Sequence, residues 1–146
     1  MNKNNVKFGL RKISTVQFAT FDSVDIKEET IKLNVGFGYG LNAGQKILGL
    51  HTRFEFLSNE TPFIILNCVC DFEIDSKTWD SFINIVSNTL TIPHSLAIHL
   101  AMITVGTARG ILHSKTENTK FNTYFLPTIN VADSIKTNIV LELQKQ

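Results

Sequence analysis

Three polar side chains have the chemistry to bind or transform a small ligand: His51, Arg53 and His99. A histidine can act as a general base, and an arginine can hold an anion. However, neither a plausible nucleophile nor a nearby carboxylate accompanies His99 in the sequence. We therefore do not expect an enzyme. A ligand-binding protein or enzyme that uses these three residues is kept as an alternative hypothesis.

The run Gly36-x-Gly38-x-Gly40 resembles a phosphate-binding loop superficially. Such a loop needs a helix that begins at the glycines, so that the helix N-terminus meets the phosphate. Here the glycines continue the alternation of a strand, and Asn42 and Gly44 follow as turn residues. We expect no nucleotide site. Instead, a strand face without side chains lets another backbone approach closely.

Metal and disulfide chemistry has little support. Cys68 and Cys70 lie two positions apart on a predicted strand, so both should point to one apolar face and pack as small hydrophobic side chains. A metal site needs further ligands. His94 and His99 are five positions apart, which places them on different faces of a helix, unlike the i, i+4 pair of a zinc site. We predict no metal, no cofactor and no disulfide.

The composition is that of one globular domain over residues 1–146. The 14 basic and 13 acidic residues give a net charge of +1 without a basic patch, so we expect no nucleic-acid partner. Residues 2–5 are polar, with no apolar signal region after them. We expect a cytoplasmic protein.

The first half of the chain is predicted to form strands. Four segments alternate between apolar and polar residues, as is typical of strands with one covered face. Short connections, at Gly40–Gly44 and Asn59–Pro62, predict antiparallel neighbours. The four predicted strands are roughly Leu10–Phe21, Thr30–Tyr39, Lys46–Leu57 and Phe63–Ile74.

The second half changes to helical spacing. Asp75 offers a capping oxygen for a short amphipathic helix whose apolar residues are Trp79, Phe82, Ile85 and Val86. Strands followed by helices favour an α+β fold with the helices on one sheet face. The last stretch, residues 131–143, alternates poorly, and we leave open whether it forms a short helix or a final strand.

A long, almost uncharged helix is predicted to begin at Pro93. The 18 residues Ser95–Leu112 carry one fixed charge, Arg109, whose head should find a carboxylate, a carbonyl or water. A membrane span usually needs about 20 apolar residues. This run falls short and contains several polar residues, so we expect no membrane insertion. A helix that is apolar nearly all round must be buried on nearly all sides. A second copy or a bound chain is therefore expected to cover it.

The order of these segments resembles a known family. A strand-rich stretch, Leu10–Asp75, precedes the long helix, Pro93–Arg109, and an exit segment, Phe121–Val131. This order resembles the bacterial export chaperone SecB and its SecB-like relatives. Within the exit segment, residues 126–130 (Leu-Pro-Thr-Ile-Asn) resemble the family's Leu-Pro-x-x-Asn exit. The family's helix usually carries Phe-Pro-Tyr-Ala-Arg, of which Ala108-Arg109 is present here.

The resemblance implies a SecB-like fold, in which a four-stranded antiparallel sheet has helices packed on one face. It implies a homodimer or homotetramer, with the long helices packed between dimers. SecB proper is strongly acidic and engages the motor SecA, whereas this chain is near neutral, so SecA is a doubtful partner. The implied function is a molecular chaperone that holds non-native, extended polypeptides without nucleotide. Its role would lie in protein export or in the service of one client, such as an antitoxin.

Aromatic residues are the candidates for contact with client segments. Most aromatic side chains should belong to the core, but those of Phe121–Phe125 lie in an irregular polar loop where packing gives less reason for them. Such residues suit a surface that combines aromatic pockets with exposed backbone. The predicted client-binding residues are Phe54, Phe56, Trp79, Phe82, Phe121, Tyr124 and Phe125.

Small residues on the long helix allow close approach of a second helix. We predict an oligomer interface at Ala97, Ala101, Thr104 and Ala108. The alternative is that the same residues pack the helix tightly on its own sheet.

Overall fold

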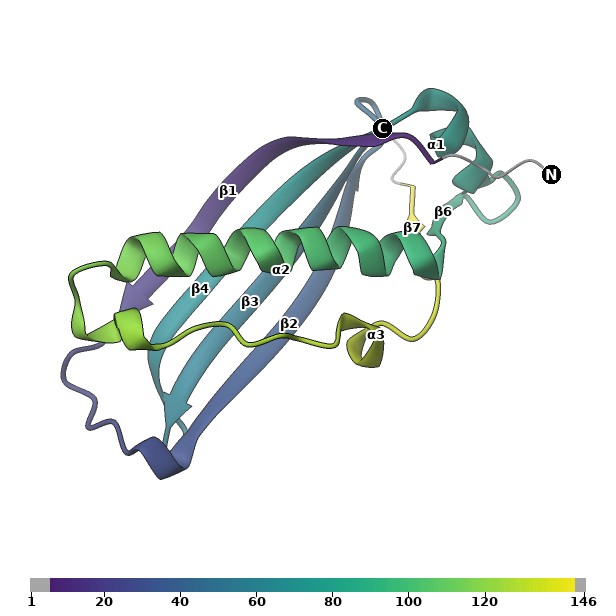
Figure 1. Cartoon of the computed structure of the whole chain (residues 1–146). Coiled ribbons are helices and arrows are strands. Elements are labelled where there is room, and N and C mark those ends of the chain that lie inside the picture. The colour runs from purple at the N-terminus through teal and green to yellow at the C-terminus, as the bar shows by residue number, and fades with distance from the viewer. Residues whose placement is uncertain (1–5, 144–146) are drawn as a thin grey trace.

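A four-stranded antiparallel sheet forms the body of the molecule, in the order β1-β4-β3-β2 (Figure 1). The computed structural model describes residues 6–143, so the polar start of the chain lies outside the described residues. The α+β fold and the four predicted strands are confirmed. The strands are β1 (Phe8–Thr20), β2 (Ile31–Asn42), β3 (Ile47–Ser58) and β4 (Thr61–Ile74).

The two edge strands of this sheet differ in regularity. β1 meets β4 with register shifts at Leu10/Lys12 and Thr15/Gln17, and such irregularities blunt an edge against further pairing. β2 pairs with β3 in unbroken register from Ile31 to Asn42. The prediction of a turn at residues 40–44 was therefore wrong at its start, because β2 continues through Gly40 to Asn42.

Each face of the sheet follows the predicted alternation. The β3 and β4 residues on one face are buried, and β2 contributes half-buried residues to the same face. We call this the inner face, because α2 (His94–Thr116) lies across it (Figure 1). The opposite, outer face carries the alternate residues, among them His51 and Arg53, and both are exposed.

The core between the inner face and α2 is rich in aromatic residues. Five large rings are 2% exposed or less, and burial of each such side chain stabilises the fold by roughly 1.5–3 kcal/mol. They are Phe54, Phe63, Phe72, Trp79 and Phe121. Cys68 and Cys70 are buried, free thiols, as predicted, and the Cys68 sulfur lies 3.2 Å from Thr52 Oγ1. Burial raises the pKa of the Cys68 thiol.

The short helix α1 (Ser76–Phe82) begins as predicted, since the Asp75 carboxylate accepts a hydrogen bond from Thr78 N at 3.4 Å. Its predicted extension through Ile85 and Val86 is wrong. These two residues form the tip of a hairpin, where Asn84 Oδ1 accepts from Val86 N at 3.0 Å. An asparagine that bonds the backbone two residues on favours a turn over a helix.

A second, three-stranded sheet was not predicted. It has the order β5-β6-β7 and joins β5 (Ile83–Asn84), β6 (Thr89–Ile92) and β7 (Ile139–Glu142). The last stretch of the chain thus contains both alternatives that the sequence left open, since α3 (Val131–Ser134) precedes β7. Asn88 ties the end of β7 to the hairpin, because its Nδ2 donates to Leu143 O at 2.8 Å.

The long helix α2 is buried on one side only. Its sheet-facing side chains are buried, whereas Ser95, His99, Met102, Gly106 and Gly110 lie on an exposed side. The expectation that this helix is covered on nearly all sides therefore does not hold within one copy of the chain. By length and composition α2 could cross a membrane, but 44% of its apolar window is buried against the rest of the protein.

Candidate functional site

An apolar strip runs along the inner face of β2. Its side chains are half-buried and pack against the edge of the core, so α2 leaves them partly open to solvent. We call these residues the β2 strip: Ile31, Leu33, Val35, Phe37, Tyr39 and Leu41. Tyr39 is held at one end of the strip, where its hydroxyl donates to Ala97 O at 3.3 Å. Burial raises the pKa of Tyr39 to about 12.

The backbone of the β2 strip points to the free edge of the sheet. Ile74 N donates to Lys46 O at 3.0 Å, which shows that even-numbered β3 residues direct their backbone groups toward β4. Hydrogen-bonded pairs alternate in an antiparallel ladder, so odd-numbered β3 residues bond to β2. Their partners include Gly36, opposite Arg53, and Gly38, opposite His51.

The odd-numbered residues of β2 are left without partners on the outer edge. Within residues 6–143 no strand pairs with β2 on that side, and no backbone hydrogen bond engages Leu33, Val35 or Phe37 there. An edge that presents unpaired N–H and C=O groups is a template for an additional strand. Lys32 is the one charged residue within β2, so little charge protects this edge.

Tyr124 covers the far end of the inner face and begins the extended part of the exit segment, residues 124–130. Its ring lies 5.0 Å from that of Phe63 and 6.1 Å from that of Phe56, measured between centroids. Its hydroxyl donates to Glu28 Oε1 at 3.1 Å, next to η1 (Glu28–Thr30). Burial and the bond to Glu28 raise the pKa of Tyr124. The contact links the exit segment to the start of β2.

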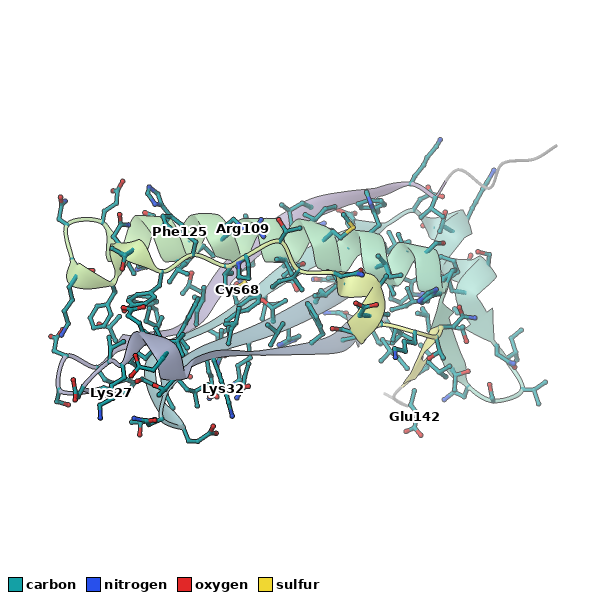
Figure 2. All side chains as sticks on the ribbon, turned by 60° about the horizontal axis from the view of Figure 1, so that its bottom comes forward. Lys27, Lys32, Cys68, Arg109, Phe125 and Glu142 are labelled. Carbon is teal, nitrogen blue, oxygen red and sulfur yellow. The ribbon has the colours of Figure 1, made fainter. Side chains whose placement is uncertain are left out.

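Arg109 fastens the exit segment to α2. Its Nε donates to Leu126 O at 2.8 Å and its Nη2 donates to Pro127 O at 2.9 Å. Of the three partners that the sequence left open for this lone charge, a carboxylate, a carbonyl or water, the structure shows carbonyls. Figure 2 shows Arg109 and Phe125 next to each other where the exit segment runs back along the helix. Leu126 is buried beneath this contact.

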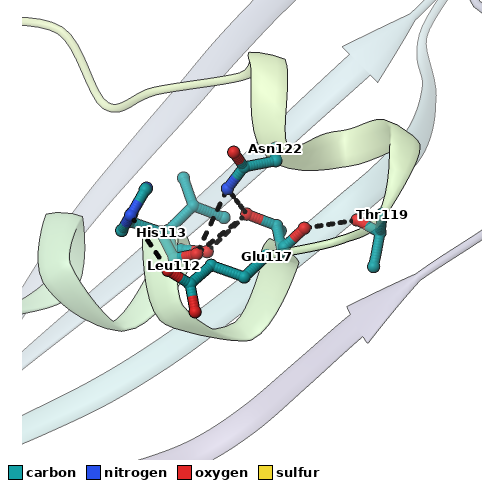
Figure 3. Close-up of polar contacts among 6 residues, drawn as sticks. Leu112, His113, Glu117, Thr119 and Asn122 are labelled. Carbon is teal, nitrogen blue, oxygen red and sulfur yellow. Dashed lines mark hydrogen bonds and ion pairs between the residues drawn. The ribbon is translucent and has the colours of Figure 1, made fainter.

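The turn that leads from α2 to the exit segment is also fixed by side chains (Figure 3). Thr116 Oγ1 donates to Leu112 O at 2.7 Å, and Asn122 Nδ2 donates to Thr116 Oγ1 at 3.1 Å. His113 Nε2 lies 3.5 Å from Glu117 Oε1. The His113 ring also stacks on that of Phe125, with the ring centroids 6.5 Å apart. Phe125 remains 57% exposed, so a large apolar ring is held in place at the surface.

The predicted client-binding residues fall into two groups. Phe54, Phe56, Trp79 and Phe121 are at most 5% exposed, so in this conformation they form core and not a binding surface. Their prediction as contact residues needs this correction, because strand alternation and helix packing turn them inward. The remaining predicted residues are accessible: Phe82 and Tyr124 are half-buried, and Phe125 is exposed.

The predicted oligomer interface also needs correction. Ala97, Ala101, Thr104 and Ala108 are each 0% exposed and face the sheet. They allow α2 to pack closely on its own sheet, which was the alternative that the sequence left open. Thr104 fits this dry site because its hydroxyl donates to Leu100 O at 2.9 Å.

The three residues of the ligand-binding hypothesis are not brought together. His51 and Arg53 lie on the outer face of the sheet, whereas His99 lies on α2 at the inner face, with its ring 5.6 Å from that of Phe8. Arg53 Nε donates to Glu55 Oε1 at 3.0 Å. Within residues 6–143 no three His, Cys, Asp or Glu side chains are placed to hold a metal ion.

Sequence reasoning missed the main feature of this surface. The apolar–polar alternation of β2 was predicted, but its position at the edge of the sheet was not. The order of strands in a sheet depends on contacts between segments that are distant in the sequence. The regular register of β2 and the register shifts of β1 likewise emerge only from pairing.

Comparison with solved structures identifies the fold of this chain, whereas comparison of sequences finds no match. No protein-family model matches the sequence, and no curated protein matches it. Among solved structures, the chain is similar to the Mycobacterium tuberculosis SecB-like chaperone Rv1957, solved in complex with a ChAD peptide from the HigA1 antitoxin. The TM-score is 0.52 at 7% sequence identity, over 84% of this chain and 91% of that one. The chain therefore has the SecB-like fold.

Proposed function

We propose that this protein is a SecB-like chaperone that holds extended, non-native polypeptide segments without nucleotide. The observation that carries the proposal is the edge of β2, where unpaired backbone groups and the half-buried β2 strip lie on the same residues. The SecB-like fold supports it, since a chaperone of that fold was solved with a peptide.

The geometry supports strand addition as the mode of binding. The N–H and C=O groups of Leu33, Val35 and Phe37 would pair with an extended client, which gives affinity without reading its sequence. The client residues opposite them would point to the inner face and rest on the β2 strip. Phe125 and Tyr124, held by Arg109 and Glu28, would meet the client at the open end of that strip.

The mechanism needs no energy source. A protein that binds the unfolded form of a client and not its native form shifts the client's folding equilibrium by mass action. Release then requires only dilution or a competing partner. We expect a cytoplasmic location and no membrane insertion for such a protein, with SecA still a doubtful partner because the outer face carries both signs of charge.

A second candidate function is a dedicated adaptor for one client, such as an antitoxin. The observation in its favour is that the structurally similar chaperone was solved with an antitoxin peptide. Both candidates use the same surface. They differ in breadth, since a dedicated adaptor binds one partner much more tightly than unrelated unfolded chains.

We further propose that a second copy covers the exposed side of α2, giving a homodimer or homotetramer. This side carries Met102, 58% exposed, followed at four-residue intervals by Gly106 and Gly110, at which an added Cβ would meet nothing within 4 Å. A glycine within a helix costs about 1 kcal/mol relative to alanine. A glycine on this exposed side allows a helix of a neighbouring copy to approach α2 closely. We therefore place the proposed interface on the exposed side of α2 and not at the buried alanines.

The test follows single amides of β2 by NMR hydrogen exchange, with reduced and carboxymethylated lactalbumin as a permanently unfolded probe. Strand addition should slow exchange at Leu33, Val35 and Phe37 by about tenfold or more, and leave Gly36 and Gly38 unchanged because they already bond to β3. Binding of the probe without slower exchange at the odd-numbered β2 amides would refute strand addition. Absence of binding would refute the chaperone proposal.

A matched pair of variants tests the same point. Val35→Pro removes an edge N–H without breaking the β2–β3 ladder, since proline is tolerated where the N–H faces away from the sheet. It should weaken binding of the probe by about tenfold. Val35→Ala removes side-chain atoms but keeps the N–H, and its effect should stay below about threefold.

A further inference from the structure

A patch of bare backbone lies on the outer face of the sheet, away from α2. Gly36, Gly38 and Gly40 follow one another on the outer side of β2, and Gly49 of β3 lies opposite Gly40. We call these four residues the glycine floor. It forms a surface that is independent of the inner face and of the proposed chaperone function.

The fold itself gives no reason for three of these glycines. None has a positive φ, so none is required by backbone conformation. A Cβ added at Gly36 would meet nothing within 4 Å, and one at Gly38 or Gly40 would meet only His51, at 3.7 and 3.8 Å. Glycine in a strand interior weakens the strand and marks sites of close approach by a ligand or another backbone.

Two adjoining cavities lie over the glycine floor. One has a volume of about 340 Å³ and is lined by Gly36 and Gly38 of β2 and, on the far side of β3, by Val69 of β4 and Val16 of β1. The other has a volume of about 280 Å³ and lies over Gly40 and Gly49. His51 lines both cavities, so one ligand can pass beside its ring from the first cavity into the second.

The first cavity suits a flat aromatic ring. Part of its floor is the bare backbone of β2, and Val69 and Val16 lie together on the β4–β1 side, so a ring can lie flat on the backbone with one apolar edge toward the valines. Arg53 stands at its border, with its guanidinium held by Glu55. A planar guanidinium favours an aromatic neighbour through stacking and cation–π attraction.

The second cavity suits a protonated amine. Its lining includes Asn42, Gln45 and Asp71, and Asp71 is the acidic residue among those that line the two cavities. The Asp71 carboxylate leans over Gly49, where it would lie 3.1 Å from an added Cβ. Within residues 6–143 it forms neither a hydrogen bond nor an ion pair through its side chain. A carboxylate in this position favours a cationic donor.

The geometry points to a binding site for a small aromatic amine on the outer face. The ring lies on Gly36 and Gly38 with one edge toward Val69 and Val16, and the ammonium group reaches Asp71 past His51. The charges agree with this orientation, because Arg53 stands at the ring end and Asp71 at the amine end.

The test uses tryptamine, indole and indole-3-acetate, which share one ring and differ in the charge of the side chain. Chemical shifts of Val16, Val69 and His51 should change in a saturable way with tryptamine. Its Kd should be about tenfold lower than that of indole-3-acetate. Asp71→Asn should remove the preference for the amine. Shifts that do not saturate at these residues, or a preference that survives Asp71→Asn, would overturn the site.

The glycine floor has a matched control in β1. Gly36→Val fills the first cavity without a backbone clash and should raise the Kd of tryptamine about tenfold or more. Gly9→Val introduces the same side chain at another open strand glycine and should change the Kd by less than about twofold. Equal effects of the two variants would contradict the proposal. A lower oligomer mass for Gly36→Val alone would show that a second copy, and not a ligand, covers the floor.

Discussion

Replacement of Arg109 by methionine should release the exit segment from α2. The substitution keeps a long apolar stem but removes the guanidinium, and with it the bonds to Leu126 O and Pro127 O. A hydrogen bond to a charged group contributes about 1.5–3 kcal/mol. The bond to Leu126 is partly buried and the bond to Pro127 is exposed, so we expect a combined loss of about 2–3 kcal/mol in the stability of this contact.

The loss can be measured locally by amide exchange. Tyr124 N bonds to Phe121 O at 3.1 Å and Val131 N bonds to Ile129 O at 3.0 Å, so these two amides report opening at either end of the segment. With every 1.4 kcal/mol equal to a factor of ten, their exchange should become roughly 30- to 150-fold faster. Binding of an unfolded client should weaken in parallel, because Tyr124 and Phe125 lose their fixed positions.

A matched control is available in Arg11, which pairs with Glu73 at 2.7 Å with both side chains more than half exposed. Such surface pairs contribute about 0–1 kcal/mol, so Arg11→Met should change exchange at Tyr124 and Val131 very little. Exchange that is unchanged in Arg109→Met would refute the reasoning that this arginine holds the exit segment.

Three further outcomes follow from the structure. Ala101→Trp should destabilise the fold by about 3 kcal/mol or more in urea unfolding, because Ala101 is fully buried against the sheet; a stable variant would contradict that packing. Met102→Glu should dissociate the oligomer in light scattering and leave the far-UV circular dichroism spectrum of the monomer unchanged, and an unchanged mass would place the interface elsewhere. Tyr39 has a folded-state pKa of about 12 against an ordinary value of 10.0, so the protein should keep its full stability below pH 10 and lose part of it as the pH rises toward 12. Tyr39→Phe should make this alkaline loss shallower, and identical pH profiles would show that burial of Tyr39 is not its cause.

Much of the sheet could be predicted because alternation is a local signal. Each main strand places its apolar residues on one face with period two, and the cap at Asp75 lies next to the helix it begins. β5 and β6 were missed for the opposite reason, and β7 was left open as one of two alternatives. The three strands span two, four and four residues, and each exists only because it pairs within the second sheet. A strand that short has no pattern of its own to detect.

The orientation of α2 could not be predicted because its two sides are chemically alike. Small residues recur at helical spacing on both, with Ala97 and Ala101 on one side and Gly106 and Gly110 on the other. Neither side carries the charges that usually mark a solvated face. Only the sheet decides which of them is buried, and that contact involves residues far away in the sequence.

The most direct test of the central claim is the aggregation of a reduced, unfolding substrate protein, with and without this protein and in the absence of ATP. The oligomer mass would be read in parallel by light scattering. The proposed chaperone should suppress aggregation at about one binding site per substrate chain, as a dimer or tetramer. Aggregation that proceeds unchanged at a several-fold excess of the protein would contradict a general holding function and leave only the dedicated-client form of the proposal.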